Sequence, residues 1–314
     1  MTLILSERDV ESLIDMREVV ASVEEAFRRE GVGDAHNSTR TRSGGNASVL
    51  NVMHANLPYL GRGGLKAYVS SKEGTRFAIL LFDTSDSRPL AIMGADILGR
   101  YRTGAASGVA TKHMYGRPSG TVALLGSGKQ ALTQALGLNS VMSVDEFRVW
   151  SPNSAHRNGF SRLLEEKGFR SAAFDSPEVA LRGAQVACAI TSSREPFLTD
   201  WMLTHVSHVN ICGSNDPDRA EITASALGTF DTVAVDDLAQ AKVEYGDLIH
   251  AVRSGTFAWE SAIELGQILA AKRAAKGRTL FKSGGVALED VAVASMLYDK
   301  AVMSGGRYPD VELR

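Results

Sequence analysis

The chain has 314 residues, of which 44% are hydrophobic and 22% charged, with a formal net charge of −2 and a pI near 6.4. This length suffices for two domains, and the composition is that of an ordinary globular protein. The nearly neutral charge excludes a general attraction to nucleic acid or acidic membranes. No basic segment precedes a long apolar run at the N-terminus, and no stretch has a membrane-spanning length. We therefore expect a cytoplasmic protein without a signal peptide.

The first hundred residues predict two helices followed by antiparallel strands. Ser6 and Asp9 have the spacing of a capping box, with aspartate in place of glutamate or glutamine. Apolar residues at helical spacing then predict a helix over 16–29. After a polar, extended stretch, apolar and alternating runs predict strands over 48–55, 63–70, 77–83 and 89–93. This meander is not the pattern of a nucleotide-binding domain.

Residues 97–115 predict a helix rich in small residues. Gly104 and Gly108 would allow another backbone or a ligand to approach closely. The first turn carries Arg100 and Arg102, whose charges oppose the helix dipole unless an anion lies beside them. Simple exposure of these arginines to solvent is the alternative interpretation.

From residue 121 onward, strands and helices alternate. Alternation of this kind predicts a parallel sheet with helices on both faces. Cys188 and Cys212 fall within apolar runs, where we expect reduced core residues rather than a disulfide or a metal pair. The expected fold class is α/β, with a doubly wound Rossmann sheet and a separate α+β domain. The predicted strands cover 122–125, 147–150, 171–174, 186–191, 208–213, 231–236 and 279–283, and the predicted helices cover 154–167, 177–183 and 289–302.

A glycine-rich turn, G-S-G-K-Q-A, follows the first strand of this alternating region. Gly126 would permit the tight turn, Gly128 would let the backbone approach a pyrophosphate, and Ala131 would let helix and strand pack closely. N–H groups of a helix expected from Lys129 would hold the phosphate charge. A structural turn with chance glycines is the alternative. The expected dinucleotide contacts are Gly126, Ser127, Gly128, Lys129 and Gln130.

The end of the next strand bears on the choice of dinucleotide. An acidic residue at this position binds the ribose hydroxyls of NAD, but here the position is Ser151. Asn153 and Arg157 follow, and these suit a ribose 2′-phosphate better than a free diol. We predict NADP(H), with NAD(H) as the alternative because a strand ending in serine can accept either.

Several stretches together resemble the ornithine cyclodeaminase and μ-crystallin family, which includes archaeal alanine dehydrogenase and ketimine reductases. The stretches appear in the family's order and cover nearly the whole chain: G-G-L-K-A-Y, P-L-A-I-M-G-A-D, R-Y-R-T-G-A-A-S-G-V-A-T-K, the glycine loop, V-N-I-C-G-S-N and S-G-G-V-A-L-E-D-V-A-V-A. The resemblance implies a substrate-binding and dimerisation domain over 1–117 and 289–314. It also implies a Rossmann domain over 118–288 and a homodimer.

The resemblance also implies the roles of individual residues. Lys66 matches the family lysine that takes part in proton transfer at the substrate nitrogen, and Arg102 matches an arginine that binds the substrate carboxylate. Arg40 resembles the second carboxylate-binding arginine, although Arg42 is close enough for an error of register. A surface cation is the alternative for each. Further candidates for cofactor contact are Thr103, Thr191, Ser283 and Gly284.

One departure from the family pattern narrows the chemistry. Cyclodeaminase and alanine dehydrogenase relatives carry an aspartate two residues after the glycine that follows Cys212, and here Asn215 occupies that position, followed by Asp216. A neutral amide can orient a substrate but cannot accept its proton, so the sequence disfavours ornithine cyclodeamination unless Asp216 turns inward.

We therefore predict an NAD(P)H-dependent imine reductase or amino-acid dehydrogenase, which would reduce a 2-imino acid to the amino acid. Lys66 would be the proton donor, and Asn215 a polar contact near the reacting nitrogen. A cyclodeaminase with tightly bound NAD and a non-catalytic ligand-binding protein are the alternatives. Arg42 and Lys72 are extra cations expected near the pocket entrance, so a dicarboxylic substrate is a further alternative. The histidines are scattered along the chain, and the sequence therefore predicts no metal site.

Overall fold

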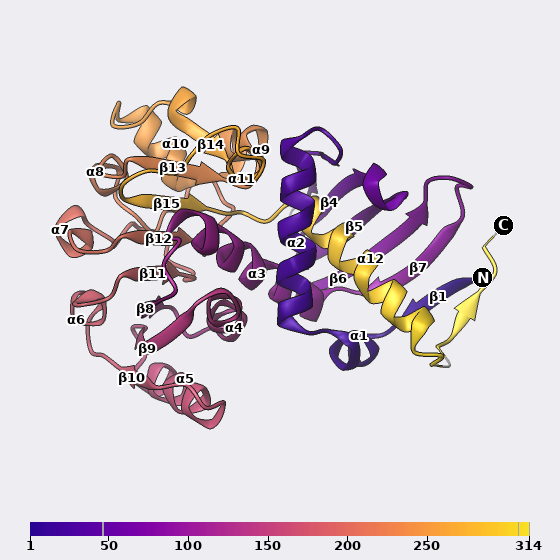
Figure 1. Ribbon diagram of the computed structural model, residues 1–314, viewed down its shortest axis with the longest axis horizontal. Coiled ribbons are helices and arrows are strands. Elements are labelled where there is room, and N and C mark those ends of the chain that lie inside the picture. Colours follow the sequence, from indigo (N-terminus) through magenta and orange to yellow (C-terminus); the bar gives the residue numbers. More distant parts are fainter. Residues whose placement is uncertain (46, 307, 314) are drawn as a thin grey trace. The chain divides into compact units, whose positions relative to one another are not determined.

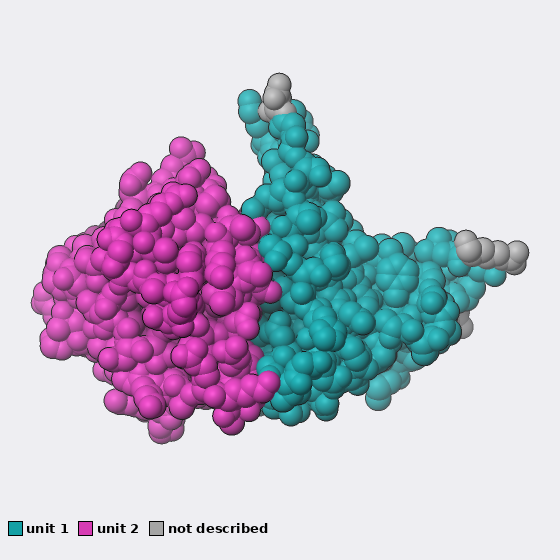
Figure 2. Space-filling model, turned by 90° about the horizontal axis from the view of Figure 1, so that it is seen from above, with its two compact units in different colours: residues 1–102, 286–314 teal, residues 103–285 magenta. Residues whose placement is uncertain are grey.

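The computed structural model describes residues 1–45, 47–306 and 308–313, and the chain divides into two compact units. Unit 1 comprises residues 1–102 and 286–314, and unit 2 comprises residues 103–285 (Figure 2). These boundaries fall at 102/103 and 285/286, whereas the sequence placed them at 117/118 and 288/289. Within the described chain, no helix is both long and apolar enough to cross a membrane.

Unit 1 contains a mixed sheet with the strand order β16-β1-β7-β6-β5-β4-β2, and β3 also pairs with β4. The four expected strands are confirmed as β4 to β7, which form an antiparallel meander. The short strand β1 was not expected, and it pairs in parallel with β7. The strands of this sheet are β1 (Thr2–Leu5), β2 (His36–Asn37), β3 (Thr41–Gly44), β4 (Ser48–Leu57), β5 (Arg62–Ser71), β6 (Gly74–Asp83), β7 (Pro89–Gly94) and β16 (Asp310–Val311).

The helices of unit 1 include the two that the sequence predicted near its start. They are α1 (Glu7–Leu13) and α2 (Met16–Gly31), and the capping box of Ser6 and Asp9 is present in full. The long helix α12 (Ala287–Met303) packs against α2, β4 and β5 (Figure 1). A short 3-10 helix, η1 (Pro58–Leu60), joins β4 to β5. The first turn of α12 thus belongs to the unit that contains Lys66.

Helix α3 (Asp96–Met114) begins in unit 1 and ends in unit 2. Its N-terminus is capped by the Glu7 carboxylate, which accepts the N–H groups of Asp96 at 2.7 Å and Ile97 at 3.0 Å. Arg100 pairs with Asp96 one turn earlier in the same helix. Carboxylates of the chain therefore offset the unfavourable charge of Arg100, and this arginine does not require a bound anion.

The second half of α3 packs unusually close to α4 (Ala131–Val141). A Cβ atom at Gly104 would lie 2.0 Å from the Thr133 carbonyl oxygen, and one at Gly137 would lie 2.0 Å from the Gly104 carbonyl oxygen. The close approach expected of the small residues is therefore present, and the neighbour is a backbone. This packing explains why unit 2 begins inside α3.

Unit 2 is a doubly wound sheet with the strand order β10-β9-β8-β11-β12-β15-β13-β14, in which every pairing is parallel. The expected parallel sheet is confirmed, although the sequence did not predict β14 or the helices α7 to α11. The strands are β8 (Ser119–Leu125), β9 (Ser143–Trp150), β10 (Ser171–Ala173), β11 (Val186–Ala189), β12 (His208–Ile211), β13 (Thr232–Val235), β14 (Ala262–Glu264) and β15 (Thr279–Lys282).

The connections of unit 2 set the position of a ligand site. The helices are α5 (Ser154–Glu166), α6 (Pro177–Leu181), α7 (Asp200–Leu203), α8 (Ala224–Leu227), α9 (Leu238–Glu244), α10 (Gly246–Arg253) and α11 (Leu265–Leu269), with a 3-10 turn η2 (Trp259–Ser261). The chain extends from β8 to β9 and β10 on one side, and then returns to place β11 on the other side of β8. Dinucleotides bind at such a reversal, beside the carboxyl ends of the strands.

Candidate active site

Lys66 lies in the middle of β5 in unit 1, where it pairs with Met53 of β4 and Ile79 of β6. The residue is only 2% exposed, and its Nζ donates to Oδ2 of Asp290 at 2.5 Å. Burial lowers the pKa of Lys66 to about 8, helped by the positive charge of Arg102, while Asp290 partly opposes the shift. A lysine with this pKa can exchange a proton near neutral pH.

Arg102 is held by the same part of α12. Its Nε donates to Oδ1 of Asp290 at 3.0 Å, and its Nη1 donates to Oε2 of Glu289 at 2.8 Å. Both carboxylates are fully buried. The acidic pair therefore fixes the guanidinium in one orientation, and Asp290 bridges the two cations that the sequence assigned to substrate binding.

Arg40 is buried in the segment between β2 and β3, and its charge also helps to lower the pKa of Lys66. Arg42, two residues later, is exposed, and its Nε donates to Oδ1 of Asn51 at 3.2 Å. Lys72 is exposed in the turn between β5 and β6. The structure therefore brings Arg40, Lys66 and Arg102 together, and it places Arg42 and Lys72 on the surface.

Glu289 and Asp290 are site residues that reasoning from the sequence did not identify. The signal was present, because two adjacent acidic residues stand at the start of a helix whose first half is otherwise apolar, in the stretch V-A-L-E-D-V-A. Buried carboxylates are costly unless they are paired with a cation. An E-D pair in such a helix therefore predicts cations nearby, which here are Lys66 and Arg102.

The glycine loop of unit 2 follows β8, next to the end of β11. Gly126 has φ +119°, and a Cβ atom there would lie 2.4 Å from the Ile190 carbonyl oxygen, so both conformation and space require glycine. Helix α4 begins at Ala131, two residues later than expected, because Gly128 to Ala131 form a turn in which the Ala131 N–H donates to the Gly128 carbonyl at 3.0 Å. A Cβ atom at Gly128 would meet no protein atom within 4 Å.

The start of α4 lacks a side-chain cap, as do the starts of α7, α10 and α11 in the same unit. Helices α5 and α9 are capped by the side chains of Asn153 and Asp237, whereas α4 has no side-chain cap. An N-terminus without a side-chain cap, beside an open glycine turn, suits a phosphate group. The residues present therefore fit the pyrophosphate of a dinucleotide.

The loop after β9 contains the residues expected near the adenosine ribose. The hydroxyl oxygens of Ser127 and Ser151 lie 2.8 Å apart, and Asn153 caps α5 by accepting the His156 N–H at 2.9 Å. Nη1 of Arg157 donates to the Ser151 carbonyl at 3.2 Å, and Nη2 pairs with the exposed Asp175. The strand ends in serine, and a cation lies six residues beyond it.

Asn215 lies half-buried in the loop after β12. The neighbouring Asp216 carboxylate accepts the Asp218 N–H at 3.0 Å and lies 3.5 Å from Nε of Arg219. Asp216 therefore stabilises its own turn in this structure. The inward rotation that would have restored an acid at this position is not observed.

The remaining cofactor candidates make hydrogen bonds within unit 2, three of them to buried carboxylates. Thr191 donates to Glu221, and the Ser283 hydroxyl and the Gly284 N–H donate to Asp236 at 2.9 and 3.0 Å. The Thr103 carbonyl accepts from Gln134 of α4 at 3.4 Å. Thr191 and Ser283 follow β11 and β15, so they share the carboxyl edge of the sheet with Gly126. Thr103 lies in α3.

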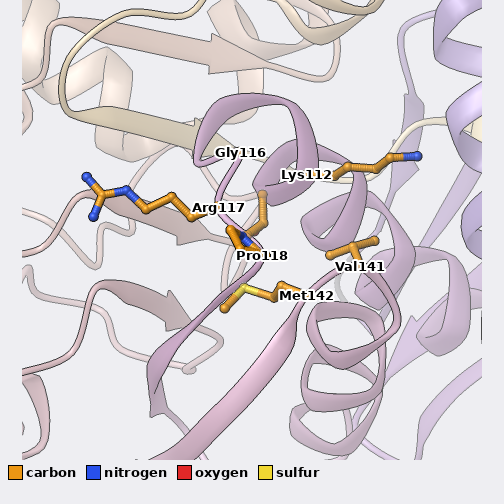
Figure 3. A pocket seen from close by; sticks show the side chains of 7 residues that line it. Lys112, Gly116, Arg117, Pro118, Val141 and Met142 are labelled. Carbon is orange, nitrogen blue, oxygen red and sulfur yellow. The ribbon is translucent and has the colours of Figure 1, made fainter.

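A separate cavity of about 230 Å³ opens elsewhere on unit 2. Its lining residues precede β8 and β9, so it lies at the amino edge of the sheet, opposite the glycine loop. Figure 3 shows the side chains of Lys112 and Arg117 pointing away from its centre. It contains none of the predicted site residues, and we assign it no role in the candidate site. The lining residues are Thr111, Lys112, Gly116, Arg117, Pro118, Val141 and Met142.

Two further expectations concern metals and thiols. Across residues 1–45, 47–306 and 308–313, no three His, Cys, Asp or Glu side chains are arranged to hold a metal ion. Cys188 is buried and Cys212 half-buried, and both are free thiols.

Comparison with known proteins gives consistent matches along the chain. The sequence model of the ornithine cyclodeaminase/mu-crystallin family matches residues 1–305. Alanine dehydrogenase of Archaeoglobus fulgidus is 32% identical over 314 residues, 96% of this chain and 95% of the relative. Delta(1)-pyrroline-2-carboxylate reductase of Bacillus cereus is 31% identical over 233 residues, 72% of this chain and 71% of the relative.

A solved structure extends the similarity to three dimensions. Thermococcus litoralis Delta(1)-pyrroline-2-carboxylate reductase, in complex with NADH and L-proline, matches with a TM-score of 0.91 at 28% identity. The match covers 99% of this chain and 100% of that one.

Proposed function

The chain belongs to the ornithine cyclodeaminase/mu-crystallin family, and from this premise we propose that it is an NAD(P)H-dependent reductase of a 2-imino acid. The imine is either cyclic or formed from a 2-oxo acid and an amine, and the product is the amino acid. The observation that carries the proposal is the buried Lys66, with its pKa lowered to about 8, among Arg40, Arg102 and the Glu289–Asp290 pair. The similar alanine dehydrogenase and pyrroline-2-carboxylate reductases act on substrates of this class.

Each charged residue has a place in this reaction. Arg40 and Arg102 bind the substrate carboxylate, because planar guanidinium groups match its two oxygens. Asp290 and Glu289 hold Arg102 in place and limit the positive charge buried beside it. Lys66, in its ammonium form, donates a proton to the imine nitrogen and regains one from solvent. The nicotinamide, when bound, supplies the hydride that completes the reduction at C2.

The loop after β12 favours reduction over cyclodeamination. Cyclodeamination requires an acid or base to manage ammonia loss and ring closure, and Asn215 cannot take a proton. Asp216 is engaged with Asp218 and Arg219 in its own turn. Reduction of a C=N bond needs one proton donor, which Lys66 provides.

For the cofactor, we propose a preference for NADP(H) over NAD(H). A nicotinamide dinucleotide is supported by the glycine loop, the start of α4 without a side-chain cap, and the NADH in the similar Thermococcus litoralis reductase. The 2′-phosphate is supported by Ser151 in place of an acid and by the adjacent Arg157. The ion-pair partner of Arg157 is Asp175, whose side chain is 96% exposed, and an ion pair with an exposed partner is weak. A 2′-phosphate could therefore displace it.

We further propose that unit 1 binds the substrate and unit 2 the dinucleotide. The proposed substrate contacts all belong to unit 1, apart from Asn215, whereas the glycine loop, Ser151 and Thr191 belong to unit 2. A homodimer and a cytoplasmic location stay predictions from the sequence.

A reductase screen tests the proposed function. Oxidation of NADPH and NADH would be followed with cyclic 2-carboxylated imines of five and six ring atoms, and with glyoxylate, pyruvate and oxaloacetate plus ammonia. We expect turnover with at least one imine and its loss in Lys66→Met. Ornithine with catalytic NAD is included as a separate assay. Release of ammonia from ornithine without imine reduction would replace this proposal with the lyase alternative.

A further inference from the structure

Among the buried ionisable side chains of unit 2, Glu221, Asp247 and Lys282 form one connected group that the proposed reaction does not use. Glu221 and Lys282 are fully buried and Asp247 is 1% exposed, and Nζ of Lys282 lies 2.9 Å from Oδ2 of Asp247. Removing such charges from water costs several kcal/mol per ion, and apolar residues of similar size often stabilise a fold equally well. Stability alone therefore does not account for this group of buried charges.

Glu221 joins the loops that follow two neighbouring strands. Its Oε1 accepts both the N–H and the hydroxyl of Thr191, each at 2.7 Å, and its Oε2 accepts the N–H of Gly213 at 2.7 Å. Thr191 follows β11 and Gly213 follows β12, and these strands are adjacent in the sheet. One carboxylate thus fixes the separation of the two loops at the carboxyl edge.

The residue at position 213 must be glycine for this contact to exist. A Cβ atom there would lie 2.3 Å from Oε1 of Glu221 and 2.4 Å from the Thr191 carbonyl oxygen. The carboxylate therefore occupies the space that any other side chain would need.

Lys282 and Asp247 complete the network. Oδ1 of Asp247 accepts the backbone N–H groups of Glu221 at 2.6 Å and Ile222 at 3.1 Å, which fixes the position of Glu221 itself. Lys282 donates to the Ser214 carbonyl at 2.8 Å. The peptide that precedes Asn215 is therefore anchored to the same group of charges that holds Thr191.

The location of these loops indicates what the network is for. A dinucleotide lies across the reversal of strand order, which here falls between β8 and β11. The pyrophosphate is assigned to the glycine loop after β8 and the adenosine to the loop after β9. By elimination, the nicotinamide half of the cofactor is assigned to the loops after β11 and β12.

We propose that Glu221, supported by Asp247 and Lys282, is a positioning residue that holds the Thr191 and Gly213–Asn215 loops in the geometry that binds the nicotinamide half of the cofactor. The inference rests on the proposed function for the identity of the cofactor. Glu221 acts through backbone groups, so its removal should affect the nicotinamide half and spare the adenosine half.

Glu221→Gln provides the test. The amide has the size of the carboxylate but replaces one acceptor oxygen with an NH₂ donor, which must face either the Thr191 N–H or the Gly213 N–H. Glu244→Gln is the control, because it changes a second buried glutamate of unit 2, in α9. Gly213→Ala is a second variant, in case Glu221→Gln folds poorly. It keeps every charge, but its Cβ atom would push apart the Glu221 carboxylate and the Thr191 and Gly213 backbone.

The variants are compared by two measurements that do not require turnover, hydrogen exchange and cofactor binding. Hydrogen exchange at the Thr191 and Gly213 amides should accelerate in Glu221→Gln and stay unchanged in Glu244→Gln. In Glu221→Gln, the dissociation constant of ADP-ribose or its 2′-phosphate should equal that of the wild type. The dissociation constant of NAD(P)H should rise toward the same value, because the extra affinity contributed by the nicotinamide is lost. In an active enzyme, kcat should fall roughly 10- to 100-fold, the scale of a misplacement near 1 Å.

Three results would overturn the inference. They are unchanged exchange at both amides, equal weakening of NAD(P)H and ADP-ribose, and an effect of Glu244→Gln as large as that of Glu221→Gln. If the wild type reduces no imine, the proposed function fails, and the exchange and binding comparisons still decide the role of Glu221.

Discussion

At the scale of single residues, the candidate site depends on how charge is balanced around Lys66. Burial and Arg102 favour the neutral amine, whereas Asp290 favours the ammonium, and the resulting pKa is about 8. Both forms are therefore populated near neutral pH, as proton exchange requires. Asp290 is as important to this balance as the lysine, because it contacts both Lys66 and Arg102.

The pH dependence of reduction follows from this pKa. The donor is the ammonium form, so kcat/KM for imine reduction should fall as the pH rises through about 8, and the reverse oxidation should rise over the same range. In Asp290→Asn the attraction that favours the ammonium is lost, so the alkaline limb should move to lower pH by about one unit or more. pH profiles of wild type and variant measure this directly.

Glu289→Gln is the matched control for that profile. It removes a carboxylate that contacts Arg102 at 2.8 Å, so it should raise KM for the substrate with little movement of the alkaline limb. The role given to Asp290 would be contradicted if the pH at which kcat/KM falls on the alkaline side were unchanged in Asp290→Asn. It would also be contradicted if this pH moved equally in Glu289→Gln.

Cofactor choice is a second property at the residue scale. If Arg157 binds a 2′-phosphate, Arg157→Ala should raise KM for NADPH by roughly tenfold or more, the value of a charged hydrogen bond, and leave KM for NADH nearly unchanged. Ser151→Asp should shift the preference toward NADH by repelling the phosphate and accepting the ribose hydroxyls. Steady-state kinetics with both cofactors decide the matter, and a wild-type preference for NADH would refute the NADP(H) proposal.

At the scale of elements, the structure shows which local patterns are sufficient for prediction. The capping box at Ser6 and the strands of the meander could be predicted because the information lies within a few adjacent residues. Strand β1 and helices α7 to α11 could not, because the strand and three of these helices span only four or five residues. For β1, the strand character depends on pairing with β7, far away in the sequence.

The contact between α3 and α4 gives a test at this scale. Gly104→Ala would place a Cβ atom 2.0 Å from the Thr133 carbonyl oxygen, so the helices must separate. We expect a loss of stability of about 2 kcal/mol or more. Gly99→Ala, in the same helix with no atom within 4 Å of its Cβ position, should instead stabilise by roughly 0.5–1 kcal/mol. Urea unfolding compares the two, and equal effects would contradict the packing described.

At the scale of the whole molecule, the sequence could predict the fold class and the set of cations, but not what holds them. Lys66, Arg40 and Arg102 are recognisable from their motifs, whereas Glu289 and Asp290 act through contacts with residues about 190 to 220 positions away. The same holds for Glu221, whose partners Thr191 and Gly213 meet only because β11 and β12 pair. Long-range partners of buried charges are set by topology, which local patterns do not contain.

The central claim is that the protein reduces a C=N bond next to a carboxylate. The most direct test supplies NAD(P)H carrying deuterium at the transferable C4 position, together with the imine that the screen identifies as the substrate. Mass spectrometry of the product should show one deuterium at the α-carbon of the amino acid, and Lys66→Met should form this product far more slowly. Product without deuterium at the α-carbon, or consumption of ornithine with no reduction of any imine, would contradict the claim.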